Sequence, residues 1–308
     1  MARESQHKDV NDPTVFVLYR YNPNLVAAIV FVVLFALTTF YHIYQIGRKR
    51  TWYFIPLVIG GLFEFVGYIG RVQSHFDQWK LGPFIMQSLL LLVAPALFAA
   101  SIYIILGRII LLTDGEKHSL IRQKWLTKIF VAGDVISFLV QSGGGGIQAS
   151  GTESSMKVGE KLIIVGLFIQ LAFFGFFVLV AGLFHTRLQR HGPASATVNL
   201  EALPWKRHLV ALYASSGFIL VRSVFRVIEY LMGNAGYLLK HEVFLYVFDA
   251  VLMLGVMLVF NYIHPSEITE LYHQRIQGEK DPQSHSRTES DIELQAKNGR
   301  EVRGGPWS

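Results

Sequence analysis

The stretch FIMQSLLLLVAPALFAASIYIIL, residues 84–106, decides the fold of this 308-residue chain. It contains no Asp, Glu, Lys or Arg, and it exceeds the roughly 20 apolar residues that a helix needs to cross a membrane. Lipid offers no hydrogen-bond partners, so the backbone there must form a helix or join a closed barrel. Barrel strands alternate apolar and polar residues, and this stretch does not. We therefore predict a transmembrane helix.

Six further apolar runs predict an all-α, polytopic membrane protein with seven transmembrane helices. The predicted spans lie near residues 25–46, 53–71, 84–106, 127–147, 161–184, 209–232 and 243–263. They form one membrane domain, 25–265, between an N-terminal segment, 1–24, and a polar tail, 266–308. The tail is rich in Gln, Glu, Lys, Arg, Ser and Gly, a composition typical of disorder.

Basic residues in the connections predict the orientation of the bundle. One side carries twelve, namely Arg48, Lys49, Arg50, Arg108, Lys117, Arg122, Lys124, Lys128, Arg187, Arg190, Lys206 and Arg207. The other side carries five, namely Arg71, Lys80, Lys157, Lys161 and Lys240. Because Lys and Arg accumulate in cytoplasmic loops, we predict an extracellular N-terminus and a cytoplasmic C-terminus (N-out/C-in).

The overall composition excludes several classes of function. Hydrophobic residues make up 52% of the chain and charged residues 16%, whereas soluble domains carry about 25% charged residues. The absence of cysteine excludes disulfides, thiolate metal ligands and a cysteine nucleophile. The net charge of +6 is modest, and we assign it to orientation, so no nucleic-acid partner is expected.

Polar side chains inside the predicted spans are the candidate functional residues, because ionisable groups in a membrane are costly. In the second span they recur at the i, i+4, i+7 spacing that places them on one helical face, and the sixth span repeats this spacing. The candidates for substrate binding or translocation are Glu64, Tyr68, Arg71, Gln87, Asp134, Gln141, Gln170, Arg222, Arg226, Glu229 and Asp249.

Two interpretations of these charges stay open. Acids and arginines nearly balance, so they can pair and hold helices together, since an unpaired polar group in hydrocarbon is costly. Alternatively, they line a cavity for the polar part of a substrate, which we favour because the charge exceeds what packing requires. We expect Glu64 and Asp249 to face the polar side of the sixth span, formed by Arg222, Arg226 and Glu229.

The sequence predicts no catalytic residue, metal site or cofactor. His42, His185 and His264 lie at predicted cytoplasmic helix ends, where an intramembrane metal hydrolase is the alternative. However, no span carries the paired histidines that hold zinc on many helices. Four glycines, 143–146, lack the Lys-Ser/Thr of a phosphate-binding loop, so we predict a turn or helix end there.

Several of these polar positions also carry a family resemblance. The motifs are Glu64-x-x-Gly67-Tyr68-x-x-Arg71, the run Leu90–Arg108, Asp134-x-x-Ser137-x-x-x-Gln141, Gly166-x-x-x-Gln170, Arg222-x-x-Phe225-Arg226-x-x-Glu229, Glu242-x-x-x-Tyr246-x-Phe248-Asp249 and His264-Pro265. In these motifs, which cover roughly residues 21–265, the chain resembles the fungal lipid-translocating exporter family. The resemblance implies resistance to sphingoid long-chain bases and aminocholesterol, and tolerance of porphyrins or drugs for some members.

Export of amphipathic lipid-like molecules across a fungal plasma membrane or endomembrane is therefore the expected function. Membrane lipids and an amphipathic small molecule are the expected partners, and the oligomeric state is left open. A seven-helix receptor or stress sensor is the alternative. Against a receptor, the third span ends in Gly107-Arg108-Ile109 rather than Asp-Arg-Tyr, and the seventh lacks Asn-Pro-x-x-Tyr.

Overall fold

A computed structural model describes residues 19–148, 152–192, 203–233 and 236–280. The longer helices are α1 (Leu25–Lys49), α2 (Ile55–Phe76), α3 (Leu81–Leu112), α4 (Gln123–Gln148), α5 (Glu153–His191), α6 (Trp205–Leu231), α9 (Leu252–Tyr262) and α10 (Ser266–Lys280). Shorter elements are η1 (Trp52–Phe54), η2 (Glu116–His118), α7 (Tyr237–Lys240), α8 (Glu242–Leu245) and the π-helix η3 (Tyr246–Val251).

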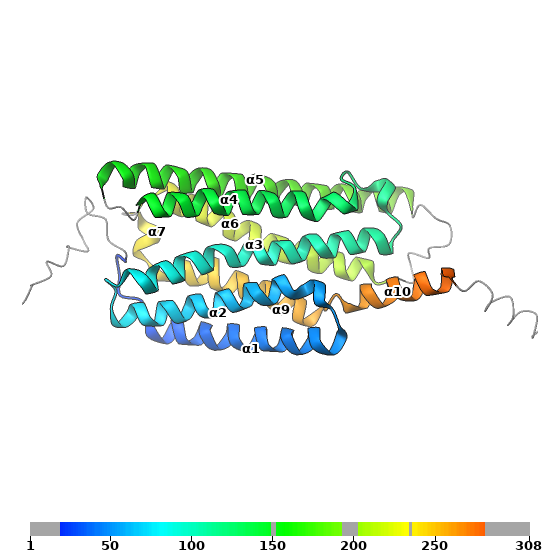
Figure 1. Ribbon diagram of the computed structural model, residues 1–308, viewed down its shortest axis with the longest axis horizontal. Helices are drawn as coiled ribbons and strands as arrows, with labels where there is room; N and C mark the ends of the chain where they lie inside the picture. The colour runs from blue at the N-terminus through cyan, green and yellow to red at the C-terminus, as the bar shows by residue number, and fades with distance from the viewer. Residues whose placement is uncertain (1–18, 149–151, 193–202, 234–235, 281–308) are drawn as a thin grey trace, which may run out of the picture.

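The helices run up and down along one long axis (Figure 1). Within the described residues, seven segments are long and apolar enough to cross a membrane: Leu25–Lys49, Trp52–Phe76, Leu81–Leu112, Gln123–Gln148, Ser154–His191, Trp205–Leu231 and Glu242–Tyr272. The predicted all-α, seven-span architecture is confirmed. We call the end of the bundle that holds residue 19 and α7 the N-terminal end, and the opposite end the α10 end.

Local sequence explains where the first two spans begin. The side chain of Asn24 accepts a hydrogen bond from the Ala27 N–H at 3.1 Å and so caps α1. Pro56 occupies the first turn of α2, where a missing N–H has no cost. α3 is the central helix, packing against α2, α4, α6 and α10, and Phe98, Tyr103 and Leu106 on it are fully buried.

The tail departs from its predicted disorder over residues 266–280, which form α10. The helix docks on the bundle: Ile268 is fully buried, and Arg108 Nη1 donates a 3.2 Å hydrogen bond to Thr269. The Arg108 guanidinium also lies 3.4 Å from the ring centre of Tyr53. Composition does not predict this helix, because a segment with few apolar residues can still fold when the bundle supplies the surface against which they pack. Residues 281–308 lie outside the described part of the chain.

The four glycines also differ from expectation, because α4 continues through them and ends at Gln148. A Cβ atom at Gly144 would lie 2.7 Å from the Gly159 carbonyl oxygen of α5. Only a residue without a side chain permits this approach. Gly144 therefore serves close packing between α4 and α5, as small residues do between membrane helices, whereas a Cβ atom at Gly143, Gly145 or Gly146 would meet no atom within 4 Å.

The seventh span is not one regular α-helix. It starts as α8, passes through the π-helix η3, and continues as α9. A π-helix holds one extra residue in a turn and is rare, occurring mostly at functional sites. The hydropathy of the span is that of an ordinary helix, so no local pattern of residues indicates this irregularity.

Candidate functional site

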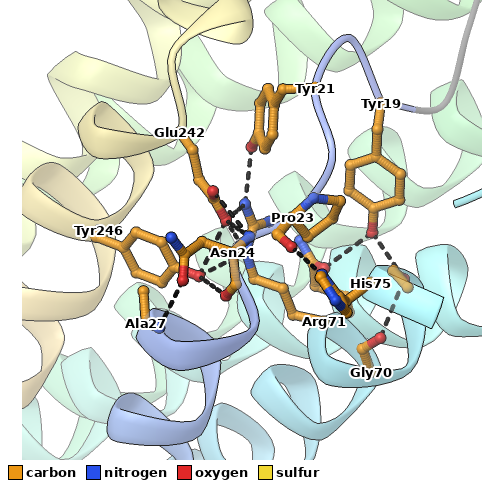
Figure 2. A network of polar contacts seen from close by, with 12 residues as sticks. Tyr19, Tyr21, Pro23, Asn24, Ala27, Gly70, Arg71, His75, Glu242 and Tyr246 are labelled. Carbon is orange, nitrogen blue, oxygen red and sulfur yellow. Dashed lines mark hydrogen bonds and ion pairs between the residues drawn. The ribbon is translucent and has the colours of Figure 1, made fainter.

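A buried ion pair joins the second and seventh spans at the N-terminal end. Arg71 is fully buried, and its Nη2 lies 2.6 Å from Oε1 of Glu242, the first residue of α8. Tyr246 donates to the same oxygen at 3.0 Å, and its hydroxyl accepts from Arg71 Nε at 3.1 Å. The Tyr21 hydroxyl accepts from Arg71 Nη2 at 2.8 Å. Figure 2 shows these groups converging on the guanidinium.

Residues 19–24, which we call the N-terminal strap, lie over this pair (Figure 2). The Asn24 N–H is 2.9 Å from both Glu242 oxygens, and His75 Nδ1 donates to the Pro23 carbonyl at 2.6 Å. The Tyr19 hydroxyl lies within hydrogen-bonding distance of Gln87 Oε1, at 2.9 Å. Burial raises the pKa of Tyr19 and of Tyr21, so both phenols stay neutral. The strap thus ties α2, α3 and α8 together.

A second ion pair lies deeper, between the sixth and seventh spans. Arg222 Nε donates to Asp249 Oδ1, and Arg222 Nη2 donates to the Leu91 carbonyl of α3 at 2.6 Å. Asp249 belongs to the π-helix η3. Glu64 is fully buried and interacts electrostatically with both Asp249 and Arg222. Asp249 thus meets the sixth span at Arg222 as expected, whereas neither carboxylate oxygen of Glu64 has a hydrogen-bond partner among the described residues.

Arg226 differs from that expectation, because its ion pair lies within its own helix. Its Nη1 is 2.5 Å from Glu229 Oε2, one turn along α6. Its guanidinium also lies 5.2 Å from the ring centre of Tyr230. Arg226 and Glu229 pair because residues three apart lie close together on a helix. The sequence is equally compatible with this pairing and with a pairing between helices.

A cavity and a groove meet beside these charges. The cavity, about 140 Å³, lies below the strap, and Arg71, Arg226 and Glu229 line it. The groove, about 290 Å³, lies between α3 and α4, and Leu81, Ile85, Leu89 and Leu92 form the apolar wall on its α3 side. The two share five lining residues: Phe84, Ser88, Gln148, Arg226 and Tyr230. The charged cavity therefore opens directly onto the apolar groove.

The other predicted polar residues form separate contacts between α3, α4 and α5. Gln141 Nε2 donates to Ser137 at 2.6 Å and to Gln170 Oε1 at 3.2 Å, and Gln141 lines the groove. Asp134 accepts from the Tyr103 hydroxyl at 3.0 Å. Asp134 and Gln170 line neither the cavity nor the groove, so the structure does not bring them into the charged cluster.

Sequence reasoning missed Glu242, Tyr246 and the strap as parts of the site. Glu242 lies one residue before the predicted seventh span, so it counted as a loop residue. It is nevertheless an acidic residue at the same end of the bundle as Arg71, the last residue on the polar face of the second span. That proximity could have indicated an ion pair between the two from sequence alone. The strap had none, because its contacts depend on the fold alone.

The three histidines do not assemble into one site. His42 and His264 both flank Phe54, with ring centres 6.0 and 5.8 Å from its own, whereas His185 packs against Trp205 and Tyr213. Among the described residues, no group of three or more His, Cys, Asp or Glu side chains is placed to hold a metal ion.

Comparison with known proteins places the chain among fungal membrane proteins. The family described as "RTA1 like protein" matches residues 57–271. The chain is 38% identical over 281 residues to Protoporphyrin uptake protein 1 of Saccharomyces cerevisiae, covering 80% of this chain and 91% of that protein. It is 34% identical over 306 residues to Protein RTA1 of the same species, covering 91% and 95%.

A more distant relative carries a transport activity in its name. Over 275 residues the chain is 26% identical to Sphingoid long-chain base transporter RSB1 of Saccharomyces cerevisiae, covering 79% of this chain and 72% of that protein. No solved structure matches the chain.

Proposed function

The chain belongs to the RTA1-like protein family, and from this premise we propose that it translocates amphipathic, lipid-like molecules across a fungal membrane. The substrate class we propose is a long-chain amphipath such as a sphingoid base or a sterol-like molecule. The membrane is a plasma membrane or an endomembrane. The protein acts as a transporter and performs no covalent chemistry on its substrate.

One observation carries this proposal: the charged cavity shares a wall with the apolar groove. An amphipath has a polar end that must stay solvated and a chain that prefers lipid. In this arrangement the polar end occupies the cavity under the strap, and the chain lies along the apolar wall that α3 gives the groove, formed by Ile85, Leu89 and Leu92. A purely structural set of ion pairs does not require a groove at its side.

The chemistry of the cavity supports a polar end that offers oxygen acceptors. Arg71 Nη1 and Arg226 Nε are buried, and neither has an acceptor among the described residues. A hydroxyl, carboxylate or phosphate oxygen of a substrate would complete them, because an unmet buried donor is costly. Glu160 and Glu229 also line the cavity, so an amine can be held beside the oxygen.

The names of the relatives fit this substrate class. One is a sphingoid long-chain base transporter and another a protoporphyrin uptake protein. Both names describe molecules with a polar and an apolar part. We extend to this chain only what they share, which is movement of an amphipath.

The decisive experiment is flux of a labelled sphingoid base in liposomes that contain the purified protein. Ser88 lies where cavity and groove meet, and its side chain is exposed. Ser88→Trp should fill the junction without disturbing the core, so flux should fall to the level of protein-free liposomes. Val221, which is 47% exposed on α6, supplies the matched control, and Val221→Trp should transport normally.

Each outcome separates the proposal from its alternatives. Equal flux in the Ser88→Trp and Val221→Trp proteins would show that the junction is not the route. Saturable binding without flux in the wild type would instead indicate a sensor. Thermal melting of both variants in detergent establishes that a loss of flux is not a loss of fold.

A further inference from the structure

Glu64 differs from the other buried acids of the spans. It is 0% exposed, and neither of its carboxylate oxygens has a hydrogen-bond donor among the described residues. By contrast, Asp249 is bound by Arg222, Glu229 by Arg226, and Asp134 by the Tyr103 hydroxyl. An ionised carboxylate without a donor in a low-dielectric interior is strongly unfavourable.

The two charged groups that act on Glu64 have opposite signs. Asp249 from η3 repels it and Arg222 from α6 attracts it. Tyr68, one turn along on α2, also has a hydroxyl without a partner in the described part of the chain and also interacts with Glu64. The adjacent helices α1 and α3 contribute apolar side chains at this level, with Phe35 stacked on Tyr68 and Leu91 packed at Gly67.

The cluster of Glu64, Asp249 and Arg222 contains two acidic side chains but one basic side chain. Glu64 and Asp249 share Arg222, whose guanidinium is already engaged by Asp249 and by the Leu91 carbonyl. One arginine neutralises one carboxylate, so the other must take up a proton to remain buried. In this conformation that acid is Glu64.

The π-helix provides a reason why this arrangement can change. Asp249 lies in η3, Tyr246–Val251, and a π turn contains one residue more than an α turn. Passage of this segment to α-helical geometry would rotate Asp249 about the helix axis by roughly 100°. Such a rotation separates Asp249 from Arg222, which is then free to neutralise Glu64.

We propose that Glu64 is a proton-binding site that couples transport to the proton gradient. The carboxylic acid of Glu64 holds the proton while Arg222 is paired with Asp249. When Arg222 turns to Glu64, the O–H bond of Glu64 breaks, the carboxylate keeps the electron pair, and the proton passes through water to Asp249, which has lost its arginine. Asp249 gives this proton up to water when it pairs with Arg222 again, and Glu64 then takes up the next proton. This inference rests on the proposed function for its coupling to transport, but the proton site itself can be tested without transport.

The direct test is infrared spectroscopy of the purified full-length protein at neutral pH. A protonated buried carboxylic acid has a carbonyl band distinct from that of a carboxylate. Asp134 is a second buried acid that is bound by a tyrosine hydroxyl and not by a base, so the comparison is made in an Asp134→Asn background. In that background the protein with Glu64 should show this band, and Glu64→Gln should lack it. Glu116→Gln is the matched control, since Glu116 is exposed in η2, and it should leave the band unchanged. Retention of the band in Glu64→Gln would overturn the proposal.

Asp249→Asn provides a second test if the Glu64 variant does not fold. Removing the competing acid should let Arg222 neutralise Glu64, so in the Asp134→Asn background the band should disappear although Glu64 is still present. A band that persists in Asp249→Asn would contradict the sharing of one arginine.

Flux in liposomes tests the coupling. The steady-state distribution of a labelled sphingoid base should change by up to about tenfold per unit of imposed pH difference if one proton moves per substrate. In Glu64→Gln it should not respond to the gradient. Wild-type flux that ignores the gradient would refute coupling alone, whereas absence of any wild-type flux would refute the proposed function. The infrared result stands in either case.

Discussion

At the scale of single residues, the Arg71–Glu242 pair illustrates how a buried charge is made tolerable. Arg71 has an exposed fraction of 0%, and the Glu242 side chain one of 15%. Two tyrosine hydroxyls complete much of the hydrogen bonding of the guanidinium. The pair therefore holds the second and seventh spans in register, while Arg71 also lines the cavity and its Nη1 has no acceptor among the described residues.

We expect Glu242→Gln to destabilise the protein by about 3–5 kcal/mol, because it leaves the Arg71 charge buried without its partner. The double variant Arg71→Gln with Glu242→Gln should recover most of that stability, since neither side chain is then charged. Thermal melting in detergent measures both. Transport should stay low in the double variant if Arg71 contacts substrate. Full recovery of transport would assign the pair a structural role only.

At the scale of elements, α10 and the strap close the bundle at its two ends. The strap bonds to α2, α3 and α8. At the other end, Tyr53 donates to the Pro265 carbonyl at 2.9 Å, and Thr269 donates to Tyr53 at 2.8 Å. Glu267 of α10 also pairs with His208 of α6 at 3.0 Å. Both segments therefore connect spans that are distant in sequence.

Truncation separates the docked part of the tail from the remainder. A chain that ends at Lys280 keeps the docking contacts of α10, so its melting temperature should match that of the full chain. A chain that ends at Pro265 loses Ile268 from the core and leaves Arg108 without Thr269. Its melting temperature should fall clearly. Equal melting of the two truncated proteins would show that α10 adds nothing to stability.

At the scale of the whole molecule, the outer surface of the bundle is suited to lipid. Every span exposes large apolar side chains, for example Leu37, Ile59, Leu89, Leu139, Leu179, Val210 and Leu258. A soluble monomer rarely exposes so much contiguous apolar surface. Glu64, Arg71, Asp134, Arg222, Glu229 and Asp249 are instead buried inside the bundle, as the cost of a charge facing hydrocarbon requires.

The orientation of the bundle is a prediction from its basic loops. An epitope tag after Ser308 should be protected from protease in intact cells, whereas a tag before Met1 should be cleaved from outside. This outcome would place the strap, cavity and groove at the outer leaflet. Digestion of the C-terminal tag in intact cells would reverse the orientation and place them at the inner leaflet.

The sequence by itself determined the seven spans, because hydropathy and length are local properties that a membrane converts directly into helices. It also identified most of the polar residues of the site, including Glu64, Arg71 and Arg222, since any ionisable residue in a span is conspicuous. A family resemblance in the same motifs pointed to lipid-like substrates. The number of spans and the list of candidates needed no knowledge of the fold.

Only the tertiary structure decided which residues meet. Arg71 pairs with Glu242, outside the predicted span, and Arg226 pairs within its own helix. Glu64 is left without a hydrogen-bond donor among the described residues, beside an arginine already paired with Asp249. These outcomes depend on how each helix is rotated, on the π-helix in the seventh span, and on where the strap and α10 return. Such features arise from packing between segments distant in sequence, which no local pattern of residues encodes.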